Sequence, residues 1–155
     1  MNKTDSKTNH SLQYYGRILL FISATLYALV AVWVISIFLV SGGDDFMLTD
    51  FGGAWVLLTR QYPNVAEDFL HFVKSNLITS LGIGLFSLTI LKFAFKRRER
   101  WTWFIMWILP LSMIEDIIYG INKGFGFEYL FGGLVVLAVL GLWISFRSFF
   151  PGKAS

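Results

Sequence analysis

The sequence predicts an all-α membrane protein, a four-transmembrane-helix bundle with both termini on the cytoplasmic side. Its 155 residues are 55% hydrophobic and only 15% charged, whereas soluble domains carry about a quarter charged residues. The apolar residues form runs that are long enough to cross the ~30 Å hydrocarbon layer of a bilayer. Lys and Arg gather at the ends of these runs. We therefore expect one membrane domain over 1–155 and neither a soluble nor a disordered chain.

The first predicted span covers 18–40 and contains no charged residue. At ~1.5 Å of rise per residue, a helix of this length crosses the hydrocarbon layer. A signal peptide is the alternative, because basic residues precede the run and Val40, Ser41 and Gly42 have the form of a weak cleavage site. The run is much longer than the ~7–15 apolar residues of a signal peptide, which favours a retained helix.

An outer loop is predicted over 41–63, the longest stretch outside the spans. Its middle is apolar and contains Trp55. Aromatic side chains are common at the membrane surface, so we expect a loop that lies there with Trp55 as an interfacial anchor. The alternative is a lid over a cavity.

The second predicted span belongs to a helix over 65–95 that begins outside the bilayer. Asn64 and Glu67 have the spacing of a capping box at its start. Small residues let helix backbones approach closely in lipid. One side of this helix carries three of them, Ser80, Gly84 and Ser87, and we expect that side to pack against a neighbour.

A basic inner tip at 96–100 leads into the third predicted span, 101–119. Pro110 lies in the middle of that span and removes the backbone hydrogen bond to the carbonyl of Met106, so a kink is expected there. The fourth predicted span, 129–150, follows a short outer loop. It carries a second side of small residues, Ala138, Gly141 and Ser145, with the same expectation of close packing.

The basic residues indicate how the bundle is oriented. With four spans, ten of the thirteen Lys and Arg residues fall on the side of the termini and the 96–100 tip. Cytoplasmic loops carry the excess of Lys and Arg. We therefore predict that both termini lie inside and that the chain is a multi-pass protein of the bacterial cytoplasmic (inner) membrane.

Composition also excludes several kinds of chemistry. The chain has no cysteine, so disulfides, thiol catalysis and Cys-ligated metals are ruled out. Its two histidines do not favour a haem or zinc site, and we expect no metal and no cofactor. The net charge of +3 comes from residues at span ends rather than from a separate basic face, so no nucleic-acid partner is expected. No phosphate-binding loop or serine-hydrolase motif is present.

A pair of adjacent carboxylates, Glu115 and Asp116, is the one candidate site. In a regular helix they lie roughly 22–24 Å along the axis from Arg100, which is short of the outer boundary of the hydrocarbon layer. Ionisable groups inside a membrane are costly, and they often mark functional sites. Their position near the C-terminal end of a helix, where the dipole disfavours negative charge, adds to that cost.

Helical spacing joins these acids to further polar residues. Ser112 is four residues before Asp116, and Tyr119 is four residues after Glu115, so all four share one broad face. His71 is expected at the same depth. The functional hypothesis is proton handling or acid–base chemistry by Glu115, Asp116, Tyr119 and His71. The alternative is that the helix end reaches wet headgroups and the acids pair with Lys123.

The segment KRRERWTWFIMWILP at 96–110 resembles the junction between the second and third helices of uncharacterised small four-helix bacterial integral membrane proteins. In these proteins a basic turn leads into a Trp-x-Trp helix with a mid-span proline. The predicted bundle with its membrane acids also resembles the four-helix fold of sterol isomerases and the sigma-2 receptor. That resemblance implies a lipid cavity near the acids but assigns no role to any residue here.

Three functions follow as expectations. The first is an accessory or interaction protein of the membrane without catalytic machinery, with a partner membrane protein or a second copy as its target. The second is a binding protein or isomerase for a small hydrophobic, lipid- or sterol-like ligand at an outer-leaflet acidic site. The third is a proton-coupled transporter of small molecules.

Overall fold

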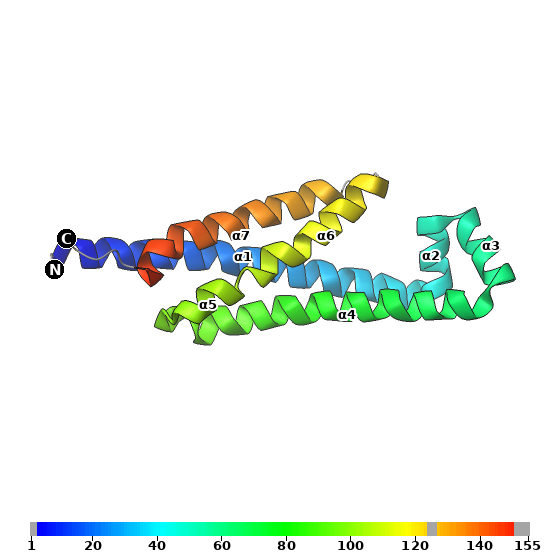
Figure 1. Cartoon of the computed structure of the whole chain (residues 1–155), viewed down its shortest axis with the longest axis horizontal. Coiled ribbons are helices and arrows are strands. Elements are labelled where there is room, and N and C mark those ends of the chain that lie inside the picture. Colours follow the sequence, from blue (N-terminus) through cyan, green and yellow to red (C-terminus); the bar gives the residue numbers. More distant parts are fainter. Residues whose placement is uncertain (1–2, 124–126, 151–155) are drawn as a thin grey trace. The chain divides into compact units, whose positions relative to one another are not determined.

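The computed structural model describes the backbone of residues 3–123 and 127–150, with the side chains of 11–118, 121 and 128–150 (Figure 1). Over these residues the chain is helical and has no strand. The elements are α1 (Lys3–Ser41), α2 (Gly43–Phe51), α3 (Gly53–Gln61), α4 (Pro63–Phe93), the 3₁₀ turn η1 (Phe95–Arg97), α5 (Arg100–Ile105), α6 (Ile108–Lys123) and α7 (Phe127–Phe149).

Four helical segments are long and apolar enough to cross a membrane. They cover Ser11–Ser41, Pro63–Arg97, Arg100–Ile118 and Glu128–Phe149. Over the described residues the chain is thereby confirmed as all-α, with four helices that are long and apolar enough to span a membrane. The helices extend beyond the apolar runs at several ends: α1 begins well before residue 18, and α6 continues past Gly120 to Lys123. A glycine costs a helix interior only about 0.5–1 kcal/mol relative to alanine, so Gly120 need not end α6.

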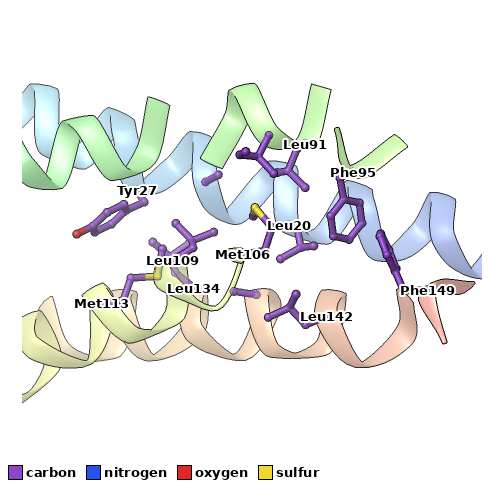
Figure 2. Packing of buried hydrophobic residues seen from close by; sticks show 13 residues of the cluster. Leu20, Tyr27, Leu91, Phe95, Met106, Leu109, Met113, Leu134, Leu142 and Phe149 are labelled. Atoms are coloured by element: carbon purple, nitrogen blue, oxygen red, sulfur yellow. The ribbon is translucent and has the colours of Figure 1, made fainter. Parts of the chain in front are cut away.

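The chain divides into two compact units, one formed by 1–28 with 83–155 and the other by 29–82. The first unit contains the start of α1, the end of α4 and all of α5, α6 and α7. Its core is a cluster of buried apolar residues that includes Leu20, Leu91, Met106, Leu134 and Leu142 (Figure 2). The helices α1, α4, α6 and α7 each contribute at least one buried side chain to this cluster. The six-residue α5 contributes the partly buried Trp103, which packs against the cluster.

Small residues bring the helices of this unit into close contact, as the sequence predicts. A Cβ atom added to Gly141 would lie 2.8 Å from the carbonyl oxygen of Gly16, so α1 and α7 approach each other backbone to backbone. Ala138 and Ser145 on the same side of α7 are fully buried. A Cβ added to Gly84 of α4 would lie 2.9 Å from the Cβ of Ala28.

Hydrogen bonds between helices supplement this packing. The Ser23 hydroxyl of α1 donates to the Leu134 carbonyl at 2.9 Å, and the Trp103 indole N–H of α5 donates to the Leu142 carbonyl at 3.0 Å. Both acceptors are carbonyls of α7. The rings of Phe95 and Phe149 pack against each other with centroids 4.6 Å apart and planes tilted by 56° (Figure 2).

The third predicted span is interrupted where Pro110 requires it. The helix stops after Ile105 and resumes at Ile108, giving α5 and α6. Because Pro110 has no N–H to donate, the Met106 carbonyl accepts from Leu109 instead, at 3.3 Å. The predicted break in the third span is therefore present, and it lies at Met106 and Trp107, one turn before Pro110.

In the second unit, residues 43–61 form two short helices, α2 and α3. We had expected a loop on the membrane surface here. They meet at Gly52, whose φ of 53° is a left-handed conformation that glycine adopts without strain. Trp55 is 3% exposed and packs against Met47 and Ala66. Its indole N–H donates to the Asp44 carboxylate at 3.2 Å. Trp55 is therefore the core of this unit and not an exposed anchor.

The start of α4 also differs from the expected capping box. The helix begins at Pro63, and the Ala66 amide donates to the Tyr62 carbonyl at 3.1 Å. Proline suits the first position of a helix, where its missing N–H has no partner in any case. Asn64 thus lies within the first turn and Glu67 just beyond it, so neither lies at the boundary where a capping box would place it.

Candidate functional site

The exposed side of α6 is a ridge of apolar residues that contains one carboxylate. We call the α6 ridge the exposed residues at spacings of three and four along this helix: Ile108, Leu111, Glu115 and Ile118. The opposite side of α6 is buried through Leu109 and Met113 and packs against α7 (Figure 1). Glu115 is therefore turned away from the core of its unit.

Asp116 has a different environment, although it is the next residue. Its side chain is half-buried and shares a hydrogen bond with the Tyr27 side chain of α1. Tyr27 is itself only 2% exposed and belongs to the core cluster (Figure 2). Consecutive residues of an α-helix point about 100° apart, since the helix has about 3.6 residues per turn. This divergence gives the two carboxylates separate surroundings.

Among the remaining members of the predicted site, only Ser112 has a described side chain in the same unit as the two acids. The Ser112 hydroxyl donates to the Leu109 carbonyl of its own helix at 2.9 Å. His71 is exposed on the part of α4 that belongs to the second unit. The side chains of Tyr119 and Lys123 lie outside the described residues. Within the first unit, the candidate site consists of Glu115, which is exposed on the surface, and of the half-buried Asp116 with its hydrogen-bond partner Tyr27.

The described side chains offer few other chemical groups. Among them, no three His, Cys, Asp or Glu residues lie close enough together to hold a metal ion. As carboxyl groups, the acids of α6 can form hydrogen bonds, pair with positive charges and exchange protons.

Sequence reasoning missed two polar contacts of this unit. Tyr27 was not singled out, although a lone tyrosine within an uncharged run is a signal that a hydroxyl needs a partner. Gln13 is buried at the start of the first span. Its side-chain amide donates to the Phe95 carbonyl at 3.0 Å, and its oxygen accepts from Arg98 Nε at 2.7 Å. Nothing in the local sequence specifies this second contact, because its partners are more than eighty residues away.

Comparisons of the chain with protein-family models, with curated proteins and with solved structures found no match. The roles of its residues therefore have to be inferred from their chemistry and their positions.

Proposed function

We propose that the chain is an accessory protein of the bacterial cytoplasmic membrane that binds another membrane protein through the α6 ridge. The observation that carries this proposal is the exposure of Glu115 within an apolar ridge on a segment that is long and apolar enough to span a membrane. A charged side chain within the hydrocarbon layer is costly, and the cost is highest at the centre of the helix and falls toward its ends. A partner that supplies a hydrogen bond or a positive charge removes that cost.

The spacing of the ridge supports a helix as the partner. Ile108, Leu111, Glu115 and Ile118 follow one another at intervals of three, four and three residues, which is the spacing of a seam between packed helices. Polar side chains in such seams form hydrogen bonds across the interface. We propose that the partner helix presents Lys, Arg or an amide side chain opposite Glu115.

The proposed orientation has both termini and the 96–100 tip in the cytoplasm. It is supported by the ten Lys and Arg residues on that side against three on the other. In this orientation the Glu115 end of α6 is nearer the outer surface, so the partner is contacted in the outer half of the membrane.

A photo-cross-linking amino acid at Ile118 tests this proposal in intact membranes. We expect a discrete protein adduct from Ile118 on the ridge and none from the control position Val136, which is similarly exposed on α7. Glu115→Ala should abolish the adduct, whereas Glu115→Gln should retain much of it, because an amide still forms hydrogen bonds.

The proposal is wrong if adducts form equally at Ile118 and Val136, or if Glu115→Ala leaves the Ile118 adduct unchanged. The mass of the adduct identifies the partner. An adduct at twice the mass of the chain would assign the ridge to a second copy and would replace the accessory function by self-association.

A second candidate is the binding of a small hydrophobic ligand, favoured by the half-buried Asp116 and its hydrogen bond to Tyr27. A carboxyl and a phenol side by side could hold a ligand hydroxyl in the outer half of the bundle. Lipid mass spectrometry of the purified protein tests this alternative. A stoichiometric small lipid that is lost in Asp116→Asn and kept in Glu115→Gln would favour it over the accessory function.

A further inference from the structure

A groove of about 450 Å³ lies between α1 and the end of α4 in the first unit. Its lining includes Tyr14, Arg17, Phe21, Ile22, Lys92 and Lys96. Three of these residues are cationic, and none of the lining residues is acidic. Neither Asp116 nor Tyr27 lines this groove, so it is distinct from the candidate site.

The lining changes from polar to apolar along both walls in the same direction. On α1, Tyr14 and Arg17 are followed by Phe21 and Ile22, roughly one turn further along the helix. On the other wall the chain runs the opposite way, from the apolar Leu91 to Lys92 and then Lys96. The basic ends of both walls therefore coincide, and so do the apolar ends.

We infer that this groove binds one anionic phospholipid. The phosphate is held by Arg17, Lys92 and Lys96, and the acyl chains lie on Phe21 and Ile22. Basic pockets between transmembrane helices on the cytoplasmic side are suited to anionic headgroups, and that leaflet carries the anionic lipids. A soluble anion would satisfy the cations but would leave the exposed apolar floor uncovered. The cationic residues and the apolar floor of the groove together favour a ligand with a negatively charged headgroup and apolar chains.

The groove is held open by contacts behind it. Gln13 donates to the carbonyls of Phe95 at 3.0 Å and Lys96 at 3.4 Å, which fixes the turn that carries Lys96 against α1. The backbone of both walls is therefore already in position when the lipid binds, which lowers the cost of ordering.

Native mass spectrometry of the full chain in neutral detergent tests this inference. Dioleoyl phosphatidylglycerol and dioleoyl phosphatidylcholine, which share the same acyl chains, are titrated in parallel. We expect one phosphatidylglycerol per chain and much weaker binding of phosphatidylcholine. Arg17→Gln with Lys92→Gln should weaken phosphatidylglycerol binding by roughly fivefold per cation, on the order of 25-fold in total.

Three controls separate a groove from a general surface charge. Arg97→Gln with Arg147→Gln removes the same charge from exposed positions outside the groove and should leave the affinity nearly unchanged. Ile22→Trp fills the apolar floor of the groove without changing its charge. This variant should lose the binding of phosphatidylglycerol. Glycerol phosphate, which has no acyl chains, should not displace the lipid.

The inference is overturned if phosphatidylcholine binds as tightly as phosphatidylglycerol, or if the Arg97 and Arg147 control loses as much affinity as the groove variant. It is also overturned if Ile22→Trp binds lipid normally or if glycerol phosphate displaces it, because either result indicates an anion site alone. Circular dichroism checks that each variant keeps its helicity. If the double charge variant loses its helicity, Ile22→Trp decides the question.

Discussion

Glu115 and Asp116 illustrate how one step along a helix separates two chemically similar residues. Asp116 has a phenol partner in the core, whereas Glu115 is exposed among isoleucines and a leucine. An interaction partner for Glu115 can therefore come from the surface side of α6, including from outside its unit. The two residues should therefore respond differently to substitution, and a variant that changes both at once would hide that difference.

Gly141 and Gly16 are the two glycines at which α1 and α7 approach each other backbone to backbone. We predict that Gly141→Ala destabilises the protein by about 1–3 kcal/mol, the usual cost of overpacking a close contact. The added methyl group would lie 2.8 Å from both the Gly16 carbonyl oxygen and Leu20 Cγ, and the first of these is backbone that cannot turn aside. Thermal unfolding in detergent, followed by circular dichroism, measures the change.

Gly133→Ala is the matched control, because an added Cβ meets no atom within 4 Å at this position of the same helix. Alanine also favours a helix over glycine by about 0.8–1 kcal/mol, so this control should be neutral or slightly stabilising. Equal stabilities for the two variants would contradict the close approach of α1 and α7.

At the scale of elements, hydropathy and proline chemistry were sufficient to predict the spans and the break in the third one. A long uncharged run has few alternatives to a membrane helix, and Pro110 acts on its own helix through a hydrogen bond that it cannot make. The helix sides that carry small residues could also be predicted, because the spacing of these residues along a helix is a local property. The neighbouring helix that each side contacts could not be predicted, because it depends on residues distant in the sequence.

The helices α2 and α3 mark the limit of local reasoning. Each has nine residues, and neither has a side-chain cap, so propensity alone does not favour them. An aromatic residue such as Trp55 fits a membrane surface and a small core equally well by composition. The contacts with Met47 and Ala66 decide between the two, and they become evident only when the chain is folded.

Trp55 should therefore determine whether α2 and α3 stay folded. We predict that Trp55→Ala costs this unit about 3–5 kcal/mol, the range for truncating a buried aromatic residue, and that it increases hydrogen exchange over 43–61. Trp55→Phe should give a smaller effect, because it keeps most of the apolar contact and loses the hydrogen bond to Asp44. Hydrogen-exchange mass spectrometry in detergent resolves this segment from the rest of the chain.

Leu57→Ala on α3 is the control, since Leu57 is 59% exposed and lies two residues from Trp55. Its exchange pattern should match that of the unchanged protein. Faster exchange in Leu57→Ala equal to that in Trp55→Ala would mean that α2 and α3 are held by membrane contact instead of by their own core.

For the whole molecule, the sequence predicted the candidate acids but not their surroundings. Intramembrane carboxylates are conspicuous in any apolar run, and their depth follows from helix geometry. Their partners depend on which helices meet. Tyr27 and Gln13 lie on the same helix, roughly 21 Å apart along its axis, yet one contacts α6 and the other the turn after α4. Such contacts are set by the assembled bundle and by no single element.

The orientation of the whole chain in the membrane is open to a direct test because the sequence contains no cysteine. We predict that Gln61→Cys reacts with a membrane-impermeant maleimide in intact cells and that Ser11→Cys reacts only after lysis. Both positions are exposed, and neither substitution alters the charge bias that sets the topology. Labelling of Ser11→Cys in intact cells would reverse the orientation and would move the basic groove to the outer leaflet. Loss of the Ser11 label from the mature chain under both conditions would instead mean that the first helix is cleaved as a signal peptide.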